Sequence, residues 1–240
     1  MAIDYNLFPM GRRAIYYDTE TTGLKSDTDR IIEIAAYDAT EKTSLCTFVN
    51  PGIPIPSEST QITGITDDMV KNAPDFKTAA EMFVEFCKGE VVLIAHNNDN
   101  FDKHFLVAEF ARAGVKLPNY PYIDTLKWAR KYRPDLPKFS LQYLREIYGV
   151  PAANAHRALD DVLVMKEVFE KMTGDLTIED IFILMNKKEG PITQMPFGKH
   201  RGVALEKVPK AYLTWLFKSG ALDKDDNSHL KETLSKLSLI

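Results

Sequence analysis

The sequence contains few cysteines and no long apolar run. Cys46 and Cys87 are the two cysteines in 240 residues, and neither has a partner at metal-ligand spacing. We predict that both are reduced core residues, with a disulfide between them as the alternative. No stretch approaches the ~18 apolar residues that cross a bilayer, and residues 1–13 include Asp4 and lack the apolar segment of a signal peptide. We therefore expect a cytoplasmic protein with no membrane partner.

An excess of positive charge is also missing. The formal net charge is −4, which argues against a protein that binds nucleic acid through a continuous basic surface. Residues 190–240 carry eight basic and five acidic side chains, or +3, which leaves −7 for residues 1–189. An acidic body with a basic tail suits a metal-dependent enzyme acting on an anionic polymer, because cations bound by the acids allow phosphate to approach. Acidic proteins of unrelated function share this balance.

The composition is that of a globular protein, with 45% hydrophobic and 27% charged residues. Three β-rich runs joined by short connections predict an antiparallel meander, and helical and strand patterns alternate after the proline-rich stretch 51–56. The expected fold is therefore α/β, with a mixed sheet of about five strands flanked by helices. The predicted strands cover residues 13–18, 30–38, 44–49, 91–95 and 122–124, and the predicted helices cover residues 76–88 (capped by Asp75), 100–113, 125–133, 140–148 and 159–172.

Gly174 and Asp175 predict a break in the chain. We expect one domain over residues 1–175 and a small, mostly helical module over residues 176–240, with helices near 176–188 and 209–217. Such a short segment builds only a small core of its own, so we expect it to pack against the larger domain.

Acidic residues occur at three points where the predicted elements end or begin. Asp18 and Glu20 follow a buried strand, and the two-residue period of a strand points both carboxylates to the same side. Asp102 follows the apolar strand 91–95 and falls in the first turn of the next helix, where an Asp is commonly only a cap. Asp161 lies one turn into the helix that follows His156. Like charges held together are costly unless a cation lies between them, so Asp18 and Glu20 are either metal ligands or the acids of a solvated strand end.

Together, these segments resemble the DEDDh exonuclease family, the DnaQ-like enzymes with an RNase H-like fold. The resemblance rests on Asp18-Thr-Glu-Thr-Thr-Gly23, on the block from His96 to Asp102, and on His156-Arg-Ala-Leu-Asp-Asp161. The strand end at residues 123–125 is also typical. The resemblance extends from residue 13 to about residue 173. His156, five residues before Asp161, indicates the histidine branch, because Arg157 stands where the other branch has tyrosine.

The resemblance implies a 3′–5′ exonuclease that hydrolyses DNA with two Mg²⁺ ions, for which Mn²⁺ can substitute. In the family pattern Asp18 bridges both ions, Glu20 and Asp161 complete the first, and Asp102 supports the second. His156 takes a proton from the attacking water. Asp160 is a rival ligand, but it lies about 100° around the helix from Asp161.

The resemblance also implies contacts with the substrate. Thr19 at the strand end, Leu24 and Ile65 near the terminal nucleotide, and Phe101 beside Asp102 are the expected residues, although Leu24 and Ile65 are equally well explained as core residues. The chain has Thr63 where family members often have His, and one extra residue between Asn97 and Phe101. Single-stranded or 3′-ended DNA is the expected partner, RNA is the alternative substrate, and a protein that binds nucleic acid without catalysis is the alternative of another class.

The tail resembles the carboxy-terminal extension of the exonuclease X branch, through residues 195–202 and 208–217. We expect it either to grip the substrate with Lys199, His200 and Arg201 or to pack on the larger domain through its aromatic residues. Residues 236–240, Lys-Leu-Ser-Leu-Ile, resemble the peptides by which bacterial replication proteins bind the sliding clamp, so a clamp or polymerase subunit is a further expected partner. The alternative is that these residues end an amphipathic helix.

Overall fold

The computed structural model describes residues 11–151, 157–186, 192–223 and 227–240. The chain divides into two compact units, Met1–Met185 and Asn186–Ile240. Each unit is considered by itself below.

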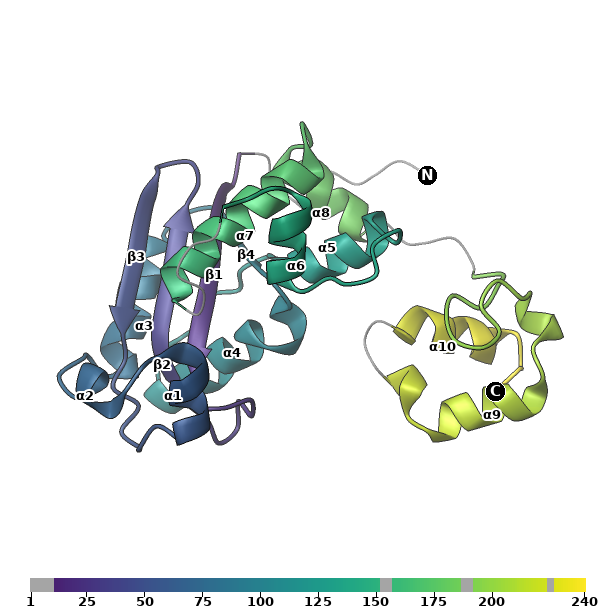
Figure 1. The fold of residues 1–240 in the computed structure, drawn as a ribbon, viewed down its shortest axis with the longest axis horizontal. Helices are drawn as coiled ribbons and strands as arrows, with labels where there is room; N and C mark the ends of the chain where they lie inside the picture. The colour runs from purple at the N-terminus through teal and green to yellow at the C-terminus, as the bar shows by residue number, and fades with distance from the viewer. Residues whose placement is uncertain (1–10, 152–156, 187–191, 224–226) are drawn as a thin grey trace. The chain divides into compact units, whose positions relative to one another are not determined.

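The first unit is built on a five-stranded sheet with the order β3-β2-β1-β4-β5 (Figure 1). The strands are β1 (Arg13–Thr21), β2 (Ile31–Asp38), β3 (Thr43–Phe48), β4 (Val91–Ala95) and β5 (Tyr122–Asp124). The first three strands are antiparallel neighbours, and β4 and β5 run parallel to β1. The predicted mixed sheet with its antiparallel meander is therefore confirmed.

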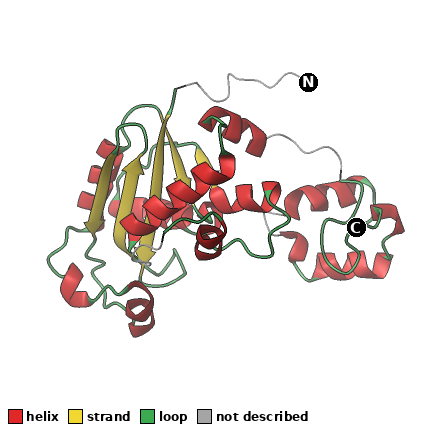
Figure 2. Ribbon diagram, turned by 45° about the horizontal axis from the view of Figure 1, so that its top comes forward, coloured by secondary structure: helices red, strands yellow, loops and turns green. Residues whose placement is uncertain are grey.

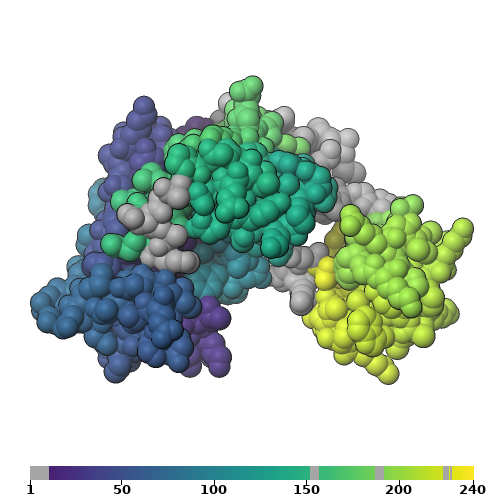
Figure 3. All heavy atoms as spheres, viewed as in Figure 1, coloured from purple at the N-terminus to yellow at the C-terminus, as the bar shows by residue number. Residues whose placement is uncertain are grey.

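Helices cover both faces of this sheet (Figure 2). Alternate residues of β1 pack against the helices of the two faces. Ile15 and Tyr17 pack on one face with the helices α3 (Phe76–Phe86) and α4 (Asp102–Ala113). Ala14 and Tyr16 pack on the other face with α5 (Thr125–Tyr132), α7 (Ala158–Thr173) and α8 (Ile178–Asn186). A third, smaller cluster lies under α6 (Leu141–Ile147). In Figure 3 the spheres of helices α5, α6 and α7 hide the centre of the sheet on one side.

Two short helices follow the proline-rich stretch, α1 (Ser57–Thr63) and α2 (Asp67–Val70). The sequence did not predict them, because seven and four residues are too few to show a helical period. The Ser59 hydroxyl donates a hydrogen bond of 2.7 Å to the Thr21 carbonyl at the end of β1. This contact fixes α1 beside the strand end that carries Glu20.

The boundary between the units lies ten residues beyond the predicted one, at Met185 instead of Asp175. The cause is α8, which was assigned to the tail. Ile181 in this helix is 2% exposed and packs in the same cluster as Trp128 and Phe169 of the first unit. The apolar face of α8 therefore belongs to the larger core.

The second unit has its own small core. Its elements are a 3₁₀ turn η3 (Leu205–Lys207), α9 (Lys210–Lys218), a 3₁₀ turn η4 (Ala221–Asp223) and α10 (Ser228–Lys236). The core residues are Met195, Leu205, Val208, Leu213, Leu216, Leu222, Leu230 and Leu234. Helix α10 ends at Lys236, so residues 237–240 follow the helix instead of forming its last turn, and Leu239 and Ile240 pack against this core.

The two cysteines differ in their environment. Both are free, so there is no disulfide between them; Cys87 is buried as predicted, but Cys46 is exposed. Cys46 lies on β3, the strand at the edge of the sheet, which has no fully buried residue. The prediction of a core position was therefore wrong for Cys46. Among the described residues, no helix combines the length and apolar character needed to span a membrane.

Candidate active site

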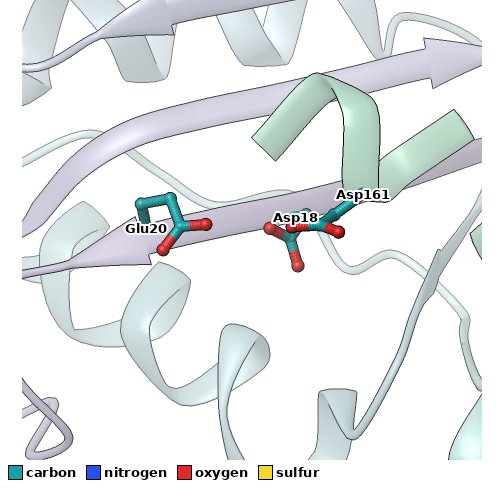
Figure 4. Close-up of side chains that lie close together, drawn as sticks. All are labelled: Asp18, Glu20 and Asp161. Carbon is teal, nitrogen blue, oxygen red and sulfur yellow. The ribbon is translucent and has the colours of Figure 1, made fainter. Parts of the chain in front are cut away.

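Three carboxylates meet at the end of β1 (Figure 4). Asp18 and Glu20 project from β1 and Asp161 from the first turn of α7, and each offers an oxygen so that the three lie within 4.8 Å of one another. Asp18 and Glu20 share the face of β1 on which Tyr16 contacts the α7 cluster. The sequence prediction that these three side chains come together agrees with this geometry. Asp160 is outside the group.

Asp102 lies next to this group but not within it. One of its carboxylate oxygens, Oδ1, accepts hydrogen bonds from the Thr19 amide at 3.1 Å and from the Thr19 hydroxyl at 2.8 Å. Asp102 is 2% exposed and begins α4, which covers the opposite face of the sheet from α7. Thr19 is itself 4% exposed. Because its amide and hydroxyl both bind Asp102, the contact of Thr19 with substrate stays a prediction.

The acids raise the pKa values of one another. Burial, followed by the charges of Asp102, Glu20 and Asp161, raises the pKa of Asp18 well above its ordinary value. Burial and the neighbouring charge of Asp161 raise the pKa of Glu20 to about 7. Burial also raises the pKa of Asp102 to about 7, although the hydrogen bonds from Thr19 act in the opposite direction. A divalent cation would remove this repulsion, and carboxylate oxygens are ligands that suit Mg²⁺ and Mn²⁺, so the donor set fits such an ion.

Glu33 fixes the helix that carries Asp161. It lies on β2 directly opposite Glu20 in the strand register and is 1% exposed. Its carboxylate accepts a hydrogen bond of 3.1 Å from the amide of Ala158, the first residue of α7, and one of 3.2 Å from the Arg157 guanidinium. An anion at a helix amino terminus satisfies free amides and interacts well with the helix dipole. This role of Glu33 was not predicted, although a lone Glu within the apolar run 31–36 is a signal for a buried polar contact.

Asp124 organises the loop that leads to Asp102. Its Oδ1 accepts hydrogen bonds from the amides of Asn97, Leu126 and Lys127, and its Oδ2 accepts one of 3.0 Å from Asp99. One side chain therefore caps α5 and holds the turn between β4 and α4. The motif around residues 123–125 was noted in the sequence, but its role in supporting this loop was not.

His96 ties the end of β4 to the segment before α6. Its Nε2 lies 2.9 Å from the Phe139 carbonyl and its Nδ1 lies 2.8 Å from the Thr125 hydroxyl. Because a carbonyl only accepts, Nε2 carries the proton and Nδ1 accepts from Thr125. Burial lowers the pKa of His96 to about 4, which keeps the ring neutral. This histidine therefore positions the motif and does not act as a base at neutral pH.

The remaining predicted residues have different environments. Leu24 is 84% exposed, on a turn closed by a hydrogen bond of 2.7 Å from the Lys25 amide to Asp29. Ile65 is 0% exposed and packs with Ile32 and other apolar residues. The side chain of Ile65 is therefore part of the core, and its contact with substrate stays a prediction.

Phe101 and His156 complete the predicted set. Phe101 is half-buried, immediately precedes α4, and packs on Phe105 with ring centroids 4.9 Å apart. Its contact with substrate stays a prediction. His156 lies outside the described residues, and the nearest described residue, Arg157, is the one that Glu33 holds.

Comparison with known proteins shows which family the chain resembles. The sequence model of a family described as Exonuclease matches residues 15–169. A second family model, named for a quorum-sensing-regulated virulence factor, matches residues 190–224. DNA polymerase III subunit epsilon of Treponema pallidum is 40% identical over 161 residues, which cover 65% of this chain and 74% of that protein.

Two further comparisons extend this result. DNA polymerase III PolC-type of Caldanaerobacter subterraneus subsp. tengcongensis is 36% identical over 191 residues; the match covers 76% of this chain but only 13% of that much longer protein. The structure of exonuclease X in complex with 5′ overhanging duplex DNA aligns with a TM-score of 0.55 and 25% identity, over 72% of this chain and 99% of that one. With the family match spanning more than half of the sequence and the acids of β1 and α7 inside it, the chain belongs to the exonuclease family.

Proposed function

We propose that the chain is a metal-dependent 3′–5′ exonuclease that hydrolyses the terminal phosphodiester bond of DNA and releases nucleoside 5′-monophosphates. The observation that carries this proposal is the meeting of Asp18, Glu20 and Asp161 in a chain of the exonuclease family. The similarity to a polymerase III epsilon subunit and to exonuclease X in complex with DNA supports DNA as the substrate.

The site would hold two divalent ions. Asp18, Glu20 and Asp161 would bind the first ion. Asp102 would support the second ion, and Asp18 would contribute to both. Bound Mg²⁺ or Mn²⁺ would neutralise charge on the phosphate and make a bound water more acidic. The protein contributes the placement of the acids: β1 fixes two of them, Glu33 fixes the helix that carries the third, and Thr19 fixes Asp102.

The proton of the attacking water would go to His156. An imidazole suits this step because its ordinary pKa lies near neutrality. His96 is unsuited to the same role, because burial lowers its pKa to about 4 and both ring nitrogens are engaged. Arg157, the residue that follows His156 in the sequence, donates a hydrogen bond to Glu33 of β2.

Apolar contacts would position the terminal nucleotide. Leu24 is exposed on a turn near the end of β1, and Phe101 immediately precedes Asp102. Such contacts do not depend on base identity, because every base has an apolar face that can stack. Selection against RNA depends on how the site meets the 2′-hydroxyl, so an exoribonuclease is the alternative outcome.

The direct test uses one oligonucleotide sequence as DNA and as RNA, labelled at the 5′ end. With Mg²⁺ we expect a ladder of products that shortens from the 3′ end, together with released 5′-monophosphates, and faster digestion of the DNA. Asp18→Asn is the matched inactive control. Activity that survives a chelator contradicts the proposal, and so does release of the 5′ nucleotide first. Faster digestion of the RNA would make RNA, and not DNA, the substrate.

A further inference from the structure

Helix α9 of the second unit places some apolar side chains inside and leaves two aromatic ones outside. Leu213 and Leu216 point into the core and are 0% and 2% exposed. Trp215 is 59% exposed and Phe217 is 47% exposed. A core that closes without Trp215 leaves the largest side chain of the helix free for another purpose.

Trp215 continues a row of three rings, which we call the aromatic row: His200, Tyr212 and Trp215. The centroids of His200 and Tyr212 are 4.6 Å apart, and those of Tyr212 and Trp215 are 5.6 Å apart. Tyr212 and Trp215 are three residues apart on α9, so they share one side of the helix.

The turn that carries His200 is shaped to lie against this row. Gly198 has φ +75°, and a Cβ added there would lie 2.4 Å from the Tyr212 hydroxyl oxygen. Glycine therefore allows the turn to approach Tyr212, and the amide of Arg201 closes the turn on the Gly198 carbonyl at 3.1 Å. The close contact of His200 with Tyr212 follows from this backbone approach.

Basic residues lie close in sequence to members of the aromatic row. Lys199 and Arg201 flank His200 and are exposed, and Lys218 follows Trp215 by three residues on the same helix. None of these three forms an ion pair with a described residue, whereas Lys231 and Lys236 of the same unit are paired with acids. Residues 190–240, which make up most of the unit, carry a formal charge of +3, whereas residues 1–189 carry −7.

An exposed tryptophan in line with two partly buried rings, beside cations that form no ion pair with a described residue, is suited to single-stranded nucleic acid. Bases stack on the rings without regard to sequence, and the cations contact the backbone phosphates. We propose that the aromatic row, with Lys199, Arg201 and Lys218, is a second nucleic-acid-binding site. It would hold a single-stranded stretch of the substrate by base stacking, in a unit separate from the one that carries the acids. This inference rests on the proposed function only for the identity of the strand as substrate.

The test uses an intrinsic signal of the full chain. The two tryptophans differ sharply in exposure, 3% for Trp128 and 59% for Trp215, so emission that responds to an added strand comes from Trp215. We expect a twelve-residue oligothymidylate, added in a chelator to prevent hydrolysis, to quench this emission with saturation. Trp215→Phe should bind similarly but lose the signal.

Fluorescence anisotropy of a labelled strand measures the affinity itself. Trp215→Ala should raise the Kd at least about fivefold, as expected for loss of one stacked base. Lys199→Gln with Arg201→Gln should lower the slope of log Kd against log salt by about 1.4. Phe217→Ala is the matched control, because Phe217 is an exposed ring of α9 outside the aromatic row; its Kd should not change.

Two results overturn the inference: an unchanged Kd for Trp215→Ala, or the same loss for Phe217→Ala. A fall in thermal stability of Trp215→Ala with unchanged binding assigns the row to packing or to a protein partner instead. The proposed function is tested separately by hydrolysis with Mg²⁺. If the natural protein binds the strand through Trp215 but hydrolyses nothing, the proposed function fails and the binding site stands. If it hydrolyses DNA and Trp215→Ala alters neither Kd nor KM, the binding site fails and the proposed function stands.

Discussion

Glu20 and Glu33 face each other in the register of β1 and β2, but the same substitution should affect them in opposite ways. Glu20 belongs to the group of mutually repelling acids. Glu33 instead accepts hydrogen bonds from Ala158 and Arg157. We predict that, without metal at pH 8, Glu20→Gln stabilises the protein and Glu33→Gln destabilises it.

The magnitude for Glu20 follows from its pKa. Burial and the charge of Asp161 raise this pKa from 4.5 to about 7. At about 1.4 kcal/mol for each pKa unit, ionised Glu20 lowers the free energy of unfolding by about 3 kcal/mol. Partial exposure of the side chain reduces this figure, so we expect a gain of about 1.5 to 3 kcal/mol for Glu20→Gln. For a unit of this size the melting temperature should rise by about 3 to 10 °C.

The effect should depend on pH with a defined sign. Because the pKa of Glu20 is higher in the folded protein than in the unfolded chain, the folded state holds the proton more tightly. The stability of the metal-free protein therefore falls as the pH rises from about 4.5 to about 7. The advantage of Glu20→Gln should be largest above pH 7 and should nearly vanish near pH 4.5.

Glu33→Gln provides the control for a general effect of removing one negative charge. A glutamine has one acceptor oxygen where Glu33 uses two, so either Ala158 or Arg157 loses its hydrogen bond. We expect a loss of about 1 to 3 kcal/mol. The assay is thermal unfolding by circular dichroism in a chelator at pH 8 and pH 5. A lower melting temperature for Glu20→Gln at pH 8, an equal gain at both pH values, or a shift of the same sign for both variants would refute the reasoning.

Three further predictions test other parts of the site. Asp18→Asn should abolish hydrolysis and remove most of the rise in melting temperature that Mn²⁺ causes in the natural protein. His156→Ala should lose most turnover but keep that rise, and loss of the rise in both variants would make His156 a metal ligand. Asp124→Ala leaves four amides without their acceptor, so we expect the free energy of unfolding, measured with denaturant, to fall by about 2 to 4 kcal/mol. Hydrogen exchange of the amides in residues 97–101 should become faster, and unchanged exchange there would contradict the role of Asp124 in the loop. Truncation after Lys188 should raise KM for long strands and flatten its salt dependence with little change in kcat; a collapse of kcat in a folded protein would place part of the active site in the second unit.

The sequence predicted the inner strands of the sheet well because they are buried on both faces. Residues 91–95 and 122–124 were predicted with the bounds that the structure shows. A strand that is covered on both sides produces an uninterrupted apolar run, which is an unambiguous signal. The predicted core position of Cys46 was wrong because the residue lies in an apolar run on an edge strand, where its side chain is exposed.

The site was predictable where spacing along one element determines geometry, and less so where distant segments meet. Asp18 and Glu20 are two residues apart on a strand, so their common side follows from the backbone alone. Ile65 and Glu33 depend on contacts over longer separations. Ile65 packs on Ile32, more than 30 residues away, and Glu33 caps a helix 125 residues further along the chain. No local pattern encodes either contact.

These distant contacts explain how repelling acids can be held together before a metal arrives. Each carboxylate of the group is fixed by an element whose own stability comes from elsewhere: β1 lies at the centre of the sheet, and α7 is anchored by Glu33 and by a buried apolar face. Asp102 is held from the opposite side of β1 by Thr19. The repulsion therefore cannot relax by moving one side chain into solvent without breaking these contacts, and proton binding is the least costly response. Metal binding at neutral pH should consequently release protons, and isothermal titration of Mn²⁺ in buffers of different ionisation enthalpy should detect them. Binding without proton release at pH 6 would mean that the acids are already ionised and that the repulsion is smaller than the pKa of Glu20 indicates.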